Sequence, residues 1–180
     1  MEKDRLKKIS KSISYWLRHH PEDIGIDIAY DGGWTDIGTL IEKAAVKVDF
    51  TFDELKHVVE TSDKQRFSIS EDETKVRANQ GHSIDVDLGL EEVVPPAILY
   101  HGAPVGVIDA IMKEGLNKMR RHHVHLSPDE KTAAVVGSRR GKFEILKIEA
   151  MRLRADGHKI YMSENGVYLI DSVPAKYIKR

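Results

Sequence analysis

Apolar residues in the first half of the chain recur three and four positions apart in three segments. This spacing puts them on one face of a helix, so we expect amphipathic helices over residues 6–17, 37–44 and 52–59. Pro21 is expected to stop the first helix, and Thr35 to cap the second. Thr51 begins the third, where Glu54 three residues later completes a capping box.

After the third helix, apolar and polar residues alternate with the two-residue period of a β-strand. Residues 66–70 alternate between apolar and polar positions, residues 71–74 supply a polar turn, and residues 75–78 return, which predicts a β-hairpin. Three helices followed by a hairpin make the winged-helix arrangement. Such a domain often reads nucleic acids, although the fold alone does not establish that role.

The second half is predicted to be an α+β unit dominated by sheet. Its patterns indicate strands over residues 97–100, 123–126, 143–148, 159–162 and 167–170. The first strand is expected to end at His101 and Gly102, and Pro104 to lie in the first turn of a helix that Gly115 terminates. Ser127 is expected to cap a further helix, with a proline at its first position. No GxGxxG follows the first strand, which excludes a Rossmann fold.

The two halves are expected to join near residues 91–97. The stretch 83–96 carries four acidic residues and no Lys or Arg, and it closes with Pro95 and Pro96. A composition shift that ends in a double proline is typical of a linker. We therefore predict an α+β protein of two domains, residues 1–94 and 95–180.

Composition narrows the class of protein. The chain has 180 residues, of which 41% are hydrophobic and none is cysteine. The lack of cysteine excludes a disulfide framework, a cysteine zinc site and a thiol nucleophile. Residues 1–5 lack the apolar core of a secretory signal, and no apolar run approaches the ~20 residues of a membrane span. We expect a cytoplasmic protein without membrane contact.

The net charge of −1 lacks the strong basic excess of a general RNA-binding protein. The basic residues instead cluster over residues 18–20, 118–123 and 139–142. Local clusters on a neutral chain indicate one phosphate-bearing target at one site, rather than tracking along a nucleic-acid backbone.

Two groups of candidate residues lie in the first half. Arg18 offers a planar fork for a phosphate, and His19 titrates near neutral pH, although cations at a helix end also favour the macrodipole without any function. Arg66 and Arg77 lie on the two hairpin strands, where an arginine is usually solvated. Residues 78–83 are dense in side-chain donors around a glycine, which is typical of a loop that approaches a polar ligand.

Two further groups lie in the second half. Residues 100–102 and 123–127 carry histidines at two predicted strand ends, where they could frame a nucleotide pocket. Arg139 and Arg140 lie late in a predicted helix between glycines, which fits a phosphate clamp and, nearly as well, a solvated helix end.

Other kinds of site receive little support. Metal binding would have to use His122, His123 and His125, but no HExxH helix and no cysteine completes such a set, so no metal is expected. The chain has no GxSxG elbow and no Walker sequence. Its acids lie in the linker and on helix faces, which disfavours a paired-carboxylate glycosidase.

Seven segments, in this order, resemble the tRNA and RNA 2′-phosphotransferase (KptA) family: residues 12–21, 33–34, 64–67, 77–83, 100–102, 123–127 and 136–139. They span nearly the whole chain. One of them would mean little, but seven in register are very specific. The resemblance implies a winged-helix RNA-binding lobe over residues 1–94 and an ADP-ribosyltransferase-like NAD-binding lobe over residues 95–180.

The resemblance also implies roles for individual residues. The implied catalytic set is Arg18, His19, Arg66 and Arg139. The implied NAD-binding set is Tyr100, His101, Gly102, His125, Leu126 and Ser127. The implied set for RNA and its 2′-phosphate is Arg77, Asn79, Gln80, Gly81, His82, Ser83 and Arg140. Two positions depart from the family's usual pattern, because Ala103 replaces a common threonine and Arg140 replaces a common histidine.

The implied reaction is the NAD-dependent removal of an internal 2′-phosphate from RNA, as at a tRNA splice junction, by a monomer that needs no metal. NAD is the co-substrate, and the route has two steps through a 2′-phospho-ADP-ribosylated RNA. Two alternatives remain. The first is a transferase of the same fold that ADP-ribosylates a terminal phosphate or another nucleic-acid acceptor. The second is a winged-helix binding module without catalysis, which would bind in a salt-dependent way and independently of NAD.

Overall fold

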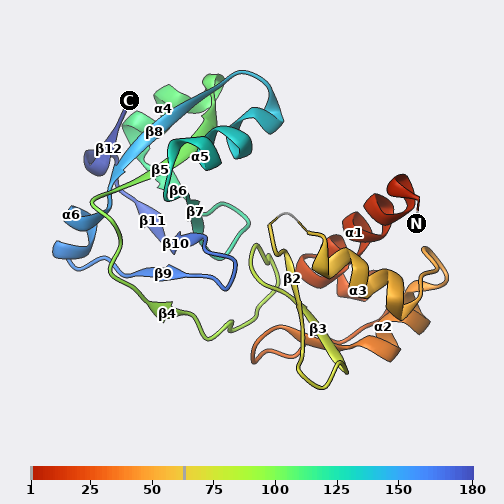
Figure 1. Cartoon of the computed structure of the whole chain (residues 1–180). Coiled ribbons are helices and arrows are strands. Elements are labelled where there is room, and N and C mark those ends of the chain that lie inside the picture. The colour runs from red at the N-terminus through yellow and green to blue at the C-terminus, as the bar shows by residue number, and fades with distance from the viewer. Residues whose placement is uncertain (1, 63) are drawn as a thin grey trace. The chain divides into compact units, whose positions relative to one another are not determined.

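The computed structural model describes residues 2–62 and 64–180. The chain divides into two compact units, one that ends at Gly89 and one that begins at Leu90 (Figure 1). Each unit has a hydrophobic core of its own, and each contains helices and strands. The predicted α+β class is confirmed. No helix in the described part of the chain is long and apolar enough to cross a lipid bilayer.

The first unit contains three α-helices at the predicted places: α1 (Lys3–Arg18), α2 (Ile37–Ala44) and α3 (Phe52–Glu60). α1 ends before Pro21, as expected, and this proline opens the short 3-10 helix η1 (Pro21–Asp23). The predicted capping box of α3 is confirmed. The Thr51 hydroxyl accepts a hydrogen bond from the Glu54 N–H, and the Glu54 carboxylate accepts one from the Thr51 N–H.

The prediction that Thr35 caps α2 is wrong. Asp36 is the N-cap, and its carboxylate accepts a hydrogen bond of 2.7 Å from the N–H of Thr39. Thr35 instead lies in the middle of a short strand, β1 (Trp34–Asp36). Either residue type can cap a helix, and the strand decides between them because it extends up to Asp36.

A three-stranded antiparallel sheet completes the first unit, with β2 (Phe67–Ile69) and β3 (Lys75–Ala78) in the order β1-β3-β2. β2 and β3 confirm the predicted hairpin. All three helices and the sheet supply the fully buried side chains of one core, among them Ile13, Leu17, Leu40, Leu55 and Val76. Because Ile13 and Leu17 belong to this core, the C-terminal end of α1 is fixed on the unit.

The chain after β3 stays with the first unit beyond the predicted hairpin. The N–H of Ser83 donates to the carbonyl of Arg18 (2.9 Å), and the N–H of Asp87 donates to the carbonyl of Tyr30 (2.8 Å). Further on, β4 (Glu91–Glu92) pairs with β9 (Ile160–Met162) in the second unit. Most of the acidic stretch 83–96 is thus attached to one unit or the other.

The second unit contains small antiparallel sheets. One has the order β4-β9-β10-β7, with β7 (Val124–Leu126) and β10 (Tyr168–Ile170). Another has the order β12-β8-β5, with β5 (Ile98–Pro104), β8 (Phe143–Glu149) and β12 (Ile178–Lys179). A third pairs β6 (Leu116–Asn117) with β11 (Ser172–Val173). The five predicted strands are therefore confirmed.

The prediction that the first of these strands ends at His101 and Gly102 is wrong. β5 continues through His101 and Gly102 to Pro104, because β8 pairs with it along its whole length, with His101 opposite Leu146. Pro104 is consequently the last strand residue rather than part of a helix. His101 therefore lies in the middle of a paired strand, which restrains its backbone.

The second unit also has the helices α4 (Ile108–Glu114), α5 (Glu130–Gly137) and α6 (Ala150–Ala155). Short 3-10 helices lie at η2 (Val105–Val107), η3 (Ser138–Arg140) and η4 (Ala175–Tyr177). Gly115 terminates α4 at φ +88°, as predicted. Asp129 caps α5, so the prediction that Ser127 does so is wrong. Ser127 is held instead by two backbone hydrogen bonds of 2.8 Å with Tyr100.

Candidate functional site

The C-terminal end of α1 carries two residues of the predicted catalytic set. Arg18 is the last helical residue, and His19 follows it with its N–H donating to the carbonyl of Tyr15 (3.0 Å). Nδ1 of His19 lies 2.8 Å from the hydroxyl oxygen of Ser83, although 64 positions separate the two residues. The backbone hydrogen bond from Ser83 to Arg18 holds the same two segments together. Two motifs that are distant in the sequence thus form one local structure.

Arg66, the third predicted catalytic residue of this unit, lies immediately before β2. Its carbonyl accepts a hydrogen bond of 3.0 Å from the N–H of Asn79. The guanidinium carbon of Arg18 lies 5.8 Å from the ring centre of Phe67, the residue after Arg66. The first unit therefore brings Arg18, His19 and the backbone of Arg66 into one region.

Asn79 supports this region from inside the protein. It is only 4% exposed. Its Nδ2 donates to the carbonyl of Gln65 (2.7 Å), and its Oδ1 accepts from the hydroxyl of Ser68 (2.8 Å). Both ends of the amide are engaged with the protein, through the backbone of Gln65 and the side chain of Ser68, which lie on either side of Arg66. This contact gives Asn79 a structural role, and its predicted contact with RNA stays a prediction.

Gln80 has a different environment from its neighbour. Its Oε1 is buried and has no hydrogen-bond partner among residues 2–62 and 64–180. Gly81 follows with φ +85°, a conformation that favours glycine, and leads into the buried His82. An acceptor that is buried without a partner costs free energy, and a ligand that donates a hydrogen bond to it recovers that cost. Gln80 is therefore suited to contact a bound molecule.

Arg77 is anchored on the sheet of the first unit. Its guanidinium carbon lies 4.6 Å from the ring centre of Trp34, and its Nη1 donates to the carbonyl of Gly32 (3.3 Å). Gly32 has φ +80°, and a Cβ there would approach the Trp34 ring at 2.7 Å. The turn before β1 thus requires glycine, and Arg77 is held in one orientation.

The predicted NAD-binding histidines are joined to one another in the second unit. Nδ1 of His101 on β5 donates a hydrogen bond of 2.9 Å to the backbone carbonyl of His125 on β7. Burial lowers the pKa of the His101 imidazole, and the bond to His125 opposes this only in part, so the neutral form of His101 is favoured. Leu126, in the same predicted set, is fully buried in the core and orients the strand.

Arg121 is a residue of this region that the sequence interpretation did not single out. Its Nη1 donates to Nδ1 of His125 at 3.1 Å. The pKa of Arg121 is lowered, first by desolvation and then by the charges of Arg140 and Arg139. Arg121 belongs to the basic cluster 118–123 and lies four positions before His125. This short separation is the feature of the sequence that could have indicated a contact between the two residues.

The predicted catalytic Arg139 lies in η3, directly after α5. Both Arg139 and Arg140 are exposed. α5 packs on β5 through two glycines, since a Cβ on Gly102 would lie 2.9 Å from Cα of Gly137. Ala103, which departs from the family pattern, is buried beside this contact. The helix that leads into Arg139 is thus set directly on the strand that carries His101.

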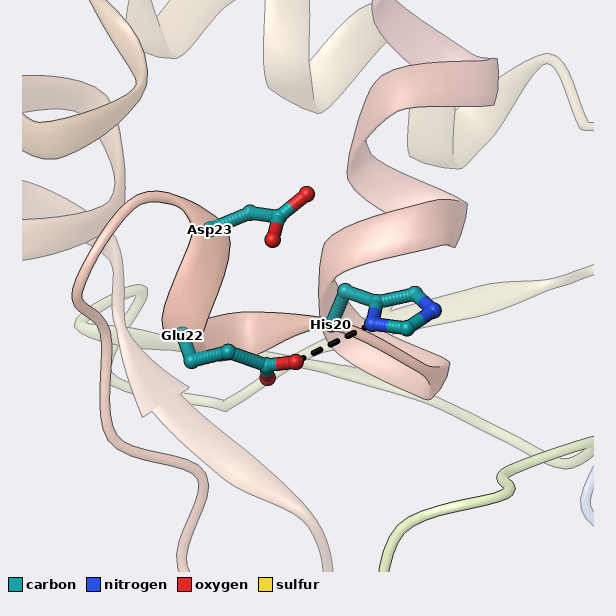
Figure 2. A group of neighbouring side chains, drawn as sticks. All are labelled: His20, Glu22 and Asp23. Atoms are coloured by element: carbon teal, nitrogen blue, oxygen red, sulfur yellow. Dashed lines mark hydrogen bonds and ion pairs between the residues drawn. The ribbon is translucent and has the colours of Figure 1, made fainter.

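One group of histidine and carboxylate side chains in the described residues has ligand atoms within 4.8 Å of one another: His20, Glu22 and Asp23 (Figure 2). Nδ1 of His20 lies 3.0 Å from a Glu22 carboxylate oxygen, and Lys47 lies 3.8 Å from Asp23. These interactions already engage the donor atoms. The histidines 122, 123 and 125, which were weighed as a metal set, do not form such a group within the described residues.

Comparison with known proteins identifies relatives over the whole length. Residues 4–172 match the model of a family described as RNA 2′-phosphotransferase, Tpt1/KptA family. A protein of Nostoc punctiforme is 50% identical, with 100% of this chain and 99% of that protein covered. One of Flavobacterium johnsoniae is 49% identical (99% and 98% covered), and one of Burkholderia pseudomallei is 50% identical (96% and 94% covered). All three bear the name "Probable RNA 2′-phosphotransferase".

Proposed function

We propose a specific reaction for this chain, which belongs to the RNA 2′-phosphotransferase (Tpt1/KptA) family of transferases: it removes an internal 2′-phosphate from RNA and passes it to the ADP-ribose part of NAD. The proposal includes a winged-helix lobe for RNA and an ADP-ribosyltransferase-like lobe for NAD. An RNA like a tRNA splice junction is the expected substrate of a monomeric enzyme.

The single observation that carries the proposal is the local structure at the end of α1. Arg18 and His19 contact Ser83 there, and the carbonyl of Arg66 accepts a hydrogen bond from Asn79, four positions before Ser83. A guanidinium group binds a phosphate through two parallel hydrogen bonds to two of its oxygens. A histidine beside it is able to accept or donate a proton near neutral pH. Both capacities are needed for phosphoryl transfer to a neutral hydroxyl.

In the proposed first step, an oxygen of the RNA 2′-phosphate attacks C1″ of the nicotinamide ribose. The bond from C1″ to the nicotinamide nitrogen breaks, and nicotinamide leaves as a neutral molecule with the electron pair. No strong general acid is required, so positioning of the charged nucleophile provides most of the acceleration. We assign this positioning to Arg18 and Arg66, and the holding of NAD to His101 and His125.

In the proposed second step, the ribose 2″-hydroxyl gives up its proton and its oxygen attacks the phosphorus atom. The bond from phosphorus to the RNA 2′-oxygen breaks, and this oxygen becomes a hydroxyl when it takes a proton. The products are RNA with a 2′-hydroxyl and ADP-ribose 1″,2″-cyclic phosphate. Charge on the phosphoryl oxygens is stabilised by Arg18, Arg66 and Arg139, and His19 acts on the proton in this step.

The proposal is tested with a short RNA that carries one internal 2′-phosphate, incubated with the purified protein in EDTA, with and without NAD. Loss of the phosphate only when NAD is present is the expected result. Reaction with a 5′- or 3′-terminal phosphate in preference to the internal one would indicate that the protein is an ADP-ribosyltransferase of terminal phosphates instead. Tight RNA binding without any consumption of NAD would indicate a binding module instead.

A further inference from the structure

The chemistry of their partners fixes the proton positions on two histidines of the second unit. A guanidinium group has only donors, so Nδ1 of His125 accepts the hydrogen bond from Arg121 and carries no proton. A carbonyl oxygen only accepts, so Nδ1 of His101 donates and carries a proton. In the neutral rings the remaining nitrogens take the opposite roles. Nε2 of His125 is then a donor, and Nε2 of His101 is an acceptor.

Positively charged groups lie near Nδ1 of His125. Arg121 donates to it directly, and Arg139 and Arg140 are close enough to lower the pKa of Arg121. A proton on Nδ1 of His125 would put a further positive charge beside these groups. It would also replace a hydrogen bond by two opposed donors. The arrangement therefore excludes the Nδ1–H form of His125 more strongly than an isolated histidine would.

Within residues 2–62 and 64–180, Arg121 has no competing acidic partner. Its pKa is shifted only by desolvation and by other arginines, and no carboxylate is paired with it in the described part of the chain. Lys118, three positions earlier, differs in this respect because it forms an ion pair of 2.5 Å with Asp171. Arg121 is thus left to interact with His125, and Lys118 anchors the start of the same loop.

We infer that Arg121 is a positioning residue that holds His125 as the neutral Nε2–H tautomer, so that His125 presents a donor nitrogen and His101 presents an acceptor nitrogen. The role of these nitrogens rests on the proposed function, in which both histidines hold NAD. Ribose hydroxyls and the carboxamide of a nicotinamide nucleotide both donate and accept hydrogen bonds. A donor and an acceptor in fixed places therefore select one orientation of such a ligand.

The tautomer is read directly by long-range ¹⁵N–¹H NMR of the uniformly labelled, full-length protein in mildly alkaline buffer. The His125 signals are assigned by their loss in His125→Asn. The expected native pattern is an unprotonated Nδ1 and a protonated Nε2 on His125, with the reverse on His101. A protonated Nδ1 on native His125 overturns the inference without the use of any Arg121 variant.

Three variants then test the part played by Arg121. Arg121→Met should give a mixture of His125 tautomers and raise the KM for NAD about tenfold, with a smaller change in kcat, as expected for one lost hydrogen bond. Arg121→Lys keeps a donor and should restore part of both effects. Arg120→Met removes a neighbouring exposed arginine that makes no hydrogen bond to a histidine in the described part of the chain, and it should leave the His125 pattern native.

Failure of this inference is distinguishable from failure of the proposed function. An unchanged His125 tautomer in folded Arg121→Met would show that Arg121 does not set it, whatever the enzyme does. A native tautomer pattern combined with no binding of NAD by calorimetry would retain the positioning of His125 but remove NAD as the ligand, and with it the functional half of the inference.

Discussion

Gly102 and Gly137 touch backbone to backbone, and this contact places α5 on β5. A Cβ on Gly102 would lie 2.9 Å from Cα of Gly137, and a Cβ on Gly137 would lie 2.9 Å from the ring of Phe143. Neither glycine is required by a positive φ, so the reason for each is close approach. The His-Gly and Gly-Ser-Arg motifs of the sequence are therefore two sides of one packing contact.

Alanine at either glycine is expected to destabilise the second unit. Gly102→Ala forces a methyl group against the backbone of Ala133 and Gly137, which cannot move as a flexible side chain does. Overpacking of this kind typically costs about 1–3 kcal/mol. Urea unfolding measures the change. Gly106→Ala is the matched control, because nothing lies within 4 Å of a Cβ there, and it should leave the midpoint nearly unchanged.

Loss of the side-chain amide should have different effects at the neighbours Asn79 and Gln80: lower stability at Asn79 and a higher KM for RNA at Gln80. Asn79→Ala removes the hydrogen bond to the Gln65 carbonyl and the one from the Ser68 hydroxyl, and should lower the free energy of unfolding by about 1–3 kcal/mol. Gln80→Met removes an unsatisfied acceptor and should change stability by less than about 0.5 kcal/mol, while it raises the KM for RNA. Urea titration and steady-state kinetics of both variants check the contrast. A destabilised Gln80→Met with a native KM would contradict the ligand role of Gln80.

Protonation of the Glu54 carboxylate at acidic pH should lower the stability of the first unit. The bonds from Arg5 (2.5 Å) and from the Thr51 N–H lower the pKa of this carboxyl from 4.5 to about 2. A lowered folded-state pKa stabilises the fold above pH 4.5, and this contribution disappears as the pH falls towards 2. Urea midpoints across this range should fall less steeply in Arg5→Met than in the native protein. Lys8→Met, which removes another exposed charge of α1, should keep the native slope.

His19→Ala should separate the two proposed chemical steps. Nicotinamide release continues because it needs no general acid, whereas formation of the cyclic phosphate slows by about 100-fold or more. ADP-ribosylated RNA therefore accumulates, which gel electrophoresis and nicotinamide quantification detect. His20→Ala is the matched control, since His20 stacks on Tyr15 and bonds to Glu22 on the surface, and it should turn over normally. A block before nicotinamide release in His19→Ala would falsify the assignment.

Local signals in the sequence predicted most elements of the fold. The capping box of Thr51 and Glu54 is complete within four residues, so nothing distant alters it. The hairpin of β2 and β3 is equally local. The predictions were wrong where pairing with a distant strand determines how far an element extends. Thr35 is drawn into β1 by β3, and His101 is drawn into β5 by β8, which lies more than 40 positions later.

The candidate site was predictable only in part for the same reason. Arg18, His19 and Arg66 carry recognisable chemistry, but their assembly depends on Ser83 and Asn79, whose partners are distant in the sequence. Asn79 looks like a ligand-binding amide until its two internal bonds are known. Arg121 was one of several basic residues in its cluster, and only the folded chain shows that its guanidinium meets His125.

The most direct test of the central claim follows the phosphate itself. An RNA radiolabelled in its single internal 2′-phosphate is incubated with the protein and NAD, and the labelled products are separated by chromatography. The account predicts that the label moves to ADP-ribose 1″,2″-cyclic phosphate, with one nicotinamide released for each phosphate removed. Label that leaves as inorganic phosphate, or that stays on the RNA while NAD is consumed, would contradict it.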